Sequence, residues 1–131
     1  MYWPTGNWQE GHASAGVTQT GTRWALAEGE NGGSADTQSY VLLANPSSDA
    51  ATVRVTLLPS DGSSATSQTF TVAANSRFTL GPGDLAGGGR FFGTLVESIN
   101  EVPIVVERSL YWNALGTFWA GGTNETGVRL R

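Results

Sequence analysis

The chain has 131 residues and lacks cysteine, and its seven basic residues are all arginine, so it also lacks lysine. Without cysteine there can be no disulfide and no thiolate metal site, and without lysine no lysine Schiff base. Histidine occurs once, which leaves too few ligands for a typical zinc site. These absences exclude several classes of enzyme and metalloprotein before any motif is considered.

Long apolar runs and positive charge are also missing. The apolar runs are about five residues or shorter, against the ~18 of a spanning helix, so we expect no membrane insertion. The net charge is -4, which argues against binding to nucleic acid. Residues 1–8 have neither the basic head nor the apolar core of a signal peptide, so an export signal would have to lie on a longer precursor.

Glycine is abundant, with 18 residues, about twice the usual share, and no segment has the 3.6-residue apolar period of a helix. Alternation is clear instead, as in Val53, Val55 and Leu57, which predicts half-buried antiparallel strands. We expect strands over the ranges 22–27, 38–44, 52–58, 66–72, 76–80, 91–98 and 104–112, with one helical turn at 83–85. The fold class predicted is all-β: an antiparallel β-sandwich, immunoglobulin-like, of about seven to nine short strands.

The two ends of the chain resemble each other. Residues 2–17 and 111–128 both begin with Tyr-Trp, contain a further tryptophan and end with Gly-Val. The two openings are 109 positions apart and the two closings 111. This pattern favours a tandem array with a period of about 110 residues, in which segment 1–17 is the tail of a preceding repeat and 18–131 is the sandwich domain. The alternative is an internal pseudo-symmetry within one closed domain.

One expected strand carries a buried charge. The face of strand 104–112 that includes Arg108 also carries apolar side chains: Ile104, Val106, Leu110 and Trp112. A desolvated guanidinium needs a carboxylate partner. We therefore predict a structural ion pair of Arg108 with Glu28 or Asp36, which would hold the acidic loop against the sheet.

Several short motifs occur in a specific order along residues 22–128. They are Trp24-Ala-Leu-Ala-Glu-Gly29, Asp36-Thr37, Tyr40-Val-Leu-Leu-Ala-Asn-Pro46, Val72-Ala-Ala-Asn-Ser76 and Val106-Glu-Arg-Ser-Leu-Tyr-Trp112. In this order they resemble the tandem-repeat domains of large bacterial surface and secreted proteins. The resemblance implies an immunoglobulin-like or related sandwich with a structural role in surface display, and it brings no catalytic residues.

Catalytic arrangements can be sought around the single histidine. The candidate partners of His12 in a Ser-His-Asp arrangement are Ser14 and Ser34, but no Gly-x-Ser-x-Gly elbow is present. A locally hydrogen-bonded histidine is therefore favoured. Two pairs of carboxylates would be formal candidates for glycoside hydrolysis: Glu28 with Glu30, and Glu97 with Glu101. Carboxylates in turns are usually solvated, so we expect no enzyme activity.

A calcium site is a weaker candidate in the acidic loop. Its oxygen ligands would be Glu28, Glu30, Asn31 and Asp36. Their spacing is not that of an EF-hand. We therefore expect no metal and no cofactor, with Ca²⁺ as the one open possibility.

Aromatic side chains gather in the two similar end segments. They are Tyr2, Trp3, Trp8, Tyr111, Trp112, Phe118 and Trp119. Such rings can pack at a junction between neighbouring units or can stack on sugars, and we favour the junction. The predicted function is thus a non-catalytic structural module of an extracellular, cell-surface bacterial repeat protein or filament, serving spacing, fibre assembly or adhesion. Its partners would be neighbouring copies of itself, and the alternative is a carbohydrate-binding module.

Overall fold

The structure is a computed structural model and describes residues 11–131. Within this range the chain forms nine strands and one short 3₁₀ helix. They are β1 (Arg23–Leu26), β2 (Gln38–Asn45), β3 (Ala51–Pro59), β4 (Thr66–Val72), β5 (Ser76–Leu80), η1 (Ala86–Gly88), β6 (Phe92–Ser98), β7 (Val105–Ala114), β8 (Thr117–Thr126) and β9 (Val128–Arg129). In residues 11–131 no helix has the length and apolar character needed to cross a membrane.

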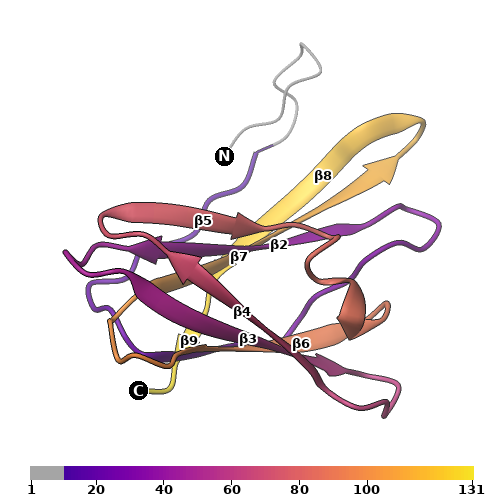
Figure 1. The fold of residues 1–131 in the computed structure, drawn as a ribbon. Helices are drawn as coiled ribbons and strands as arrows, with labels where there is room; N and C mark the ends of the chain where they lie inside the picture. Colours follow the sequence, from indigo (N-terminus) through magenta and orange to yellow (C-terminus); the bar gives the residue numbers. More distant parts are fainter. Residues whose placement is uncertain (1–10) are drawn as a thin grey trace.

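The strands form two antiparallel sheets that pack face to face (Figure 1). One sheet has the order β4-β3-β6-β1-β9 and the other the order β5-β2-β7-β8. The prediction of an all-β antiparallel sandwich is therefore confirmed. The β7–β8 hairpin projects beyond the other strands of its sheet (Figure 1).

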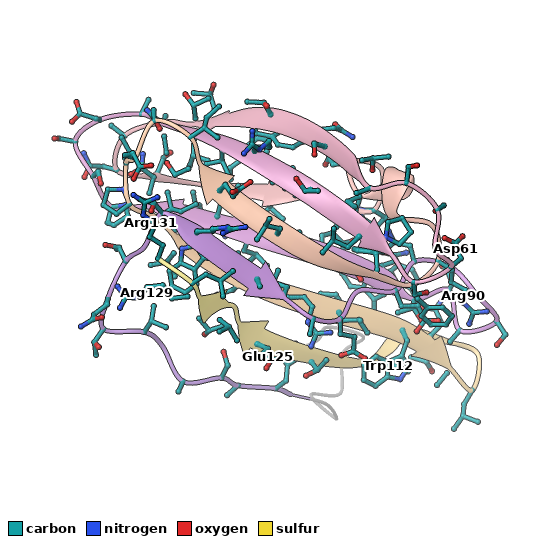
Figure 2. All side chains as sticks on the ribbon, turned by 90° about the horizontal axis from the view of Figure 1, so that it is seen from below. Asp61, Arg90, Trp112, Glu125, Arg129 and Arg131 are labelled. Carbon is teal, nitrogen blue, oxygen red and sulfur yellow. The ribbon has the colours of Figure 1, made fainter. Side chains whose placement is uncertain are left out.

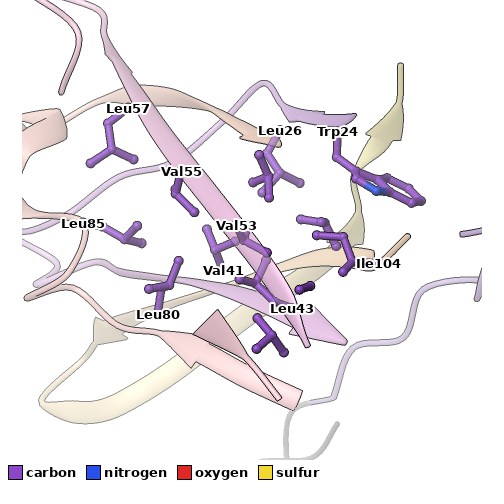
Figure 3. Packing of buried hydrophobic residues seen from close by; sticks show 14 of the residues in the cluster. Trp24, Leu26, Val41, Leu43, Val53, Val55, Leu57, Leu80, Leu85 and Ile104 are labelled. Atoms are coloured by element: carbon purple, nitrogen blue, oxygen red, sulfur yellow. The ribbon is translucent and has the colours of Figure 1, made fainter. Parts of the chain in front are cut away.

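The core lies between the inner faces of the two sheets (Figure 3). Along β3 and β6 every second side chain is buried, and β2 alternates in the same way. Trp24 is 1% exposed, and its Nε1 donates to the Gly21 carbonyl at 3.1 Å. Full burial of each Val or Leu side chain contributes about 1.5–3 kcal/mol, so this alternation accounts for the two-layer packing.

The open edge between β4 and β5 is closed by aromatic rings. Phe78 pairs with Leu43 in the sheet register, so it lies on the predicted inner face. It is nevertheless 37% exposed, because β5 is the edge strand. Its ring lies 5.8 Å from the ring of Phe70 on the facing edge strand, and the two cover this end of the core.

Two elements differ from the sequence prediction. The helical turn expected at 83–85 occurs one turn later, as η1. Residues 117–126 were interpreted as part of a junction segment, whereas they form β8, which pairs with β7 along its length. The run of glycine and small polar residues in β8 has no apolar alternation, which is why the pattern did not predict a strand there.

Candidate functional site

The candidate site lies on the β7–β8 hairpin, where two rings cover two glycines. Tyr111 pairs with Gly122 and Trp112 with Gly121 across the two strands. A Cβ at Gly122 would lie 2.7 Å from Tyr111 Cδ1, and one at Gly121 would lie 2.5 Å from Trp112 Cε2. Because side chains alternate along a strand, the two rings lie on opposite faces of the hairpin.

A bulge in β8 places Trp119 on the same face as Tyr111. The register shifts between Trp112 and Ala114, and two more residues are present on β8 than on β7 at this point. Trp119 has a φ of 50°, a left-handed conformation that is uncommon outside glycine. Asn113 Oδ1 accepts from the Trp119 backbone N–H at 2.8 Å, which stabilises the bulge.

The resulting face carries a row of stacked rings. Phe118 stacks on Trp119 with 5.0 Å between centroids, and Trp119 stacks on Tyr111 at 4.8 Å. Tyr40 on β2 meets both Tyr111 and Trp119 edge-on. Gln38 Oε1 accepts from Trp119 Nε1 at 3.1 Å and from the Tyr40 hydroxyl at 2.9 Å. The rings are thus fixed by both stacking and hydrogen bonds.

Residues 11–17, here called the strap, run alongside β8. The His12 ring lies 5.7 Å from the Tyr111 ring, and its Nδ1 hydrogen-bonds to Asn124 Oδ1. Asn124 Nδ2 donates to Ser14 Oγ at 2.6 Å. The strap therefore contacts both the aromatic row and the edge strand through side chains.

The contact continues towards the C-terminal strand. Thr126 Oγ1 donates to the Ala15 carbonyl at 3.0 Å, and Arg129 Nη1 donates to the Thr20 carbonyl at 3.2 Å. Figure 2 shows this segment passing β8 and Arg129. A shallow hollow of about 370 Å³ separates the two segments, and it is lined by Gly16, Val17, Thr18, Gln19, Trp24, Gly127 and Arg129.

The structure brings together only part of the predicted junction set. Tyr111, Phe118 and Trp119 share one face, whereas Trp112 lies on the other. The remaining predicted members lie outside the described residues: Tyr2, Trp3 and Trp8. The sequence analysis placed Trp112 on the Arg108 face of strand 104–112, which is the face opposite to that of Tyr111, and the alternation along β7 agrees with this.

Four polar or aromatic members of the site were missed by the sequence analysis. They are Gln38, Tyr40, Asn113 and Asn124. Gln38 and Tyr40 occupy the outward positions of the predicted strand 38–44, which is the signal that could have identified them. Asn113 and Asn124 depend on β8, which was not predicted.

Arg108 is buried, at 4% exposure, on the inner face. Its Nη1 lies 2.8 Å from Glu28 Oε2, and its Nη2 lies 3.5 Å from Glu125 Oε2. Of the two predicted partners the structure uses Glu28, and Asp36 instead accepts from Asn113 Nδ2 at 3.3 Å. The guanidinium thus reaches two exposed carboxylates from a buried position, which compensates its desolvation.

The four calcium candidates each have a separate protein partner. Those partners are Arg108 for Glu28, Arg90 for Glu30, the Ser39 amide for Asn31 and Asn113 for Asp36. Among the described residues, no group of three or more His, Cys, Asp or Glu side chains could hold a metal. In this structure the four side chains of the acidic loop are thus engaged in separate ion pairs and hydrogen bonds.

Comparison with known proteins gives a family and a fold. The model of a family of unknown function, DUF5719, matches residues 13–86, and no curated protein matches the sequence. A crystal structure of Thermotoga maritima 1070 is 17% identical with a TM-score of 0.68, covering 86% of this chain and 97% of that one. The Anabaena sensory rhodopsin transducer is 26% identical with a TM-score of 0.55, covering 70% and 97%.

The close contact of Tyr111 with Gly122 predicts a sensitive position. We expect Gly122→Ala to lower the free energy of unfolding by about 1–3 kcal/mol, because the new methyl group displaces the Tyr111 ring. Gly83→Ala is the matched control, since a Cβ at Gly83 meets nothing within 4 Å. Urea denaturation measures both changes, and equal midpoints for the two variants would contradict the packing described.

Burial raises the pKa of Tyr111 and of Tyr40 above the ordinary tyrosine value of 10.0. The folded state therefore retains the phenolic protons to a higher pH than the unfolded state does. The contribution of these tyrosines to the free energy of unfolding is fully present below pH 10 and is lost as the pH rises above it. We expect Tyr111→Phe to reduce this alkaline loss. Denaturation midpoints measured from pH 8 upward test this, and an unchanged slope in the variant would refute it.

Proposed function

This chain belongs to the DUF5719 family, whose function is unknown, and we propose that it is a non-catalytic structural module of an extracellular bacterial repeat protein or filament. Its end segments would pack between neighbouring units. The observation that carries this proposal is the strap, which lies along the edge strand β8 and against the aromatic row.

The aromatic row supports packing more than an open binding surface. Tyr111 is only 6% exposed, and Trp119 and Tyr40 are half-buried. Groups of the same chain cover these rings, including His12 of the strap, so the row is closed by an end segment and is not left open as a platform. The extracellular location rests on the sequence resemblance to surface and secreted repeat proteins.

A role in contact with other proteins also fits a similar fold. The Anabaena protein is by name a transducer, which is a signalling role for that protein. For the present chain we propose a role in contact with other protein molecules, which the end segments support. Spacing, fibre assembly and adhesion are the forms of binding that the repeated end segments favour.

The proposal predicts self-association of the full chain. We expect light scattering and negative-stain microscopy over a wide concentration range to show head-to-tail oligomers or filaments. Trp119→Ala should weaken this assembly because it removes the centre of the aromatic row. Phe91→Ala is the control, since Phe91 is an exposed ring outside the row. A strict monomer at every concentration would argue against assembly.

Carbohydrate binding is the second candidate, and one observation favours it. Phe118 ends the stacked row and is 53% exposed. An exposed ring beside polar side chains is a common surface for stacking a sugar. In that case the row would be a platform and not a junction.

Titration with a panel of soluble oligosaccharides distinguishes this second candidate. If sugars bind, we expect a shift in tryptophan emission that Phe118→Ala abolishes and Phe91→Ala leaves intact. Trp119 reports on this because its ring stacks directly on Phe118. Absence of any shift across the panel would remove carbohydrate binding from consideration.

A further inference from the structure

The strap has the same sequence pattern as the strand beside which it lies. Residues 8–17 align with 119–128 without a gap, at an offset of 111 positions. The identical residues of the two segments are Trp8 and Trp119, Gly11 and Gly122, Gly16 and Gly127, and Val17 and Val128. The two residues by which the second segment is longer lie between Trp112 and Trp119, where β8 forms its bulge.

Equivalent positions of the two segments also lie side by side in space. The Ala15 carbonyl meets the Thr126 side chain at 3.0 Å, which is a contact at the same offset of 111. His12 and Ser14 both form hydrogen bonds with Asn124, at offsets of 112 and 110 positions. Residue numbers rise together along both segments, so they run parallel. Further along, Thr18 and Arg129 line the same hollow.

We propose that the strap occupies the place of a neighbour's edge strand. In the assembled protein, β8 of a second copy of this chain would lie beside β8 of the first, parallel and with equivalent residues adjacent. This inference rests on the proposed function and specifies one surface of self-association. Because both copies use the same edge, this contact joins copies in pairs, and head-to-tail assembly needs a second contact. The sequence favours β8 as the partner, because four of the ten aligned positions of the two segments are identical.

The direction of the backbone carbonyls in the strap and in β8 is consistent with a neighbour's β8 in the place of the strap. The Gly127 N–H donates to the Val106 carbonyl at 2.9 Å. Since hydrogen-bonded pairs alternate along an antiparallel ladder, the carbonyl of Thr126 points away from β7 and towards the open edge. In the strap the equivalent carbonyl, that of Ala15, is the one that accepts from Thr126. A neighbour's β8 would offer the same group without leaving its own sheet.

The hydrogen bonds can also be kept. Thr123 stands in β8 where His12 stands in the strap, and its hydroxyl can donate to Asn124 Oδ1. Glu125 stands where Ser14 stands, and its carboxylate can accept from Asn124 Nδ2. The two facing sheets are turned over relative to each other, so the Glu125 side chains of the two copies lie on opposite faces, and each stays 3.5 Å from Arg108 of its own copy.

Exchange of the strap into the sheet itself is disfavoured. The position equivalent to Gly121 is Glu10. A Cβ at residue 121 would lie 2.5 Å from Trp112 Cε2, so a glutamate cannot replace this glycine beside β7 unless the indole moves. The geometry therefore favours addition outside β8 over replacement of β8.

A single cysteine tests the proposal, because the chain has none of its own. In the Thr126→Cys variant, two copies joined through β8 bring residue 126 of one copy beside residue 126 of the other. The two facing edges run parallel only if one sheet is turned over, so the thiols lie on opposite faces and cannot form a direct disulfide. A short, flexible thiol-to-thiol cross-linker should therefore give linked dimers. We expect at least fivefold more dimer than for Thr69→Cys, an exposed position on the edge strand of the other sheet. Dimer no more abundant than in this control would overturn the inference.

Weakening the strap gives an independent test. His12→Ala with Ser14→Ala removes two hydrogen bonds from the strap and leaves β8 intact, so a neighbour should replace it more easily. Two bonds of ordinary strength predict a dimer that is roughly thirtyfold tighter for each strap displaced. Weaker association of this variant would show instead that the neighbour's strap occupies the edge. The same conclusion would follow if chains became disulfide-linked only when Ala15→Cys and Thr126→Cys are both present.

The proposed function is judged separately from this surface. If light scattering shows oligomers but Thr126→Cys is not linked above the control, the module assembles through another surface and only the inference fails. If no variant associates at any concentration and none is linked, self-assembly of this chain fails as well.

Discussion

The alternation of side chains along β7 is the constraint on which both the core and the aromatic face depend. Val106 and Arg108 point between the sheets, while Tyr111 points to the outer face. A shift of one residue in the pairing would exchange the two sets. It would remove Val106 from the core and place Glu107 there, at a cost no single contact could offset. The register of β7 against β2 and β8 therefore positions the candidate site.

The inner face of β8 is nearly empty of apolar side chains, and β7 compensates for it. The inward positions of β8 are Gly121, Thr123 and Glu125. The Trp112 ring covers the first, and Arg108 approaches the last at 3.5 Å. The large ring and the positive charge on β7 thus lie opposite the small and the acidic residue on β8, which are favourable cross-strand pairs. The same pairing on the outer face, Tyr111 over Gly122, begins the aromatic row.

Most of the sandwich could be predicted because apolar alternation is a local signal. Strands β4 and β5 have the predicted bounds, whereas β2 is longer by one residue at one end and β3 by one residue at each end. β8 could not be predicted, since its strand conformation is stabilised by rings on β7 and not by its own side chains. The same holds for the site: Tyr40 joins the row only through the sheet order, which places β2 beside β7. Arg108 was identifiable because a charge on an apolar face requires a partner.

Covering a sheet edge by side-chain contacts has a different consequence from covering it by a backbone ladder. The strap is held to β8 by a few hydrogen bonds, from Asn124 and Thr126, each worth about 1 kcal/mol net. Such a cover protects an exposed edge from indiscriminate pairing, yet a competitor with the same donors and acceptors can displace it. Within a covalent array the local concentration of a neighbouring repeat is in the millimolar range, so replacement of the strap needs little intrinsic affinity. An edge that is closed in the isolated unit and opened by its neighbour would confine association to copies with the same pattern.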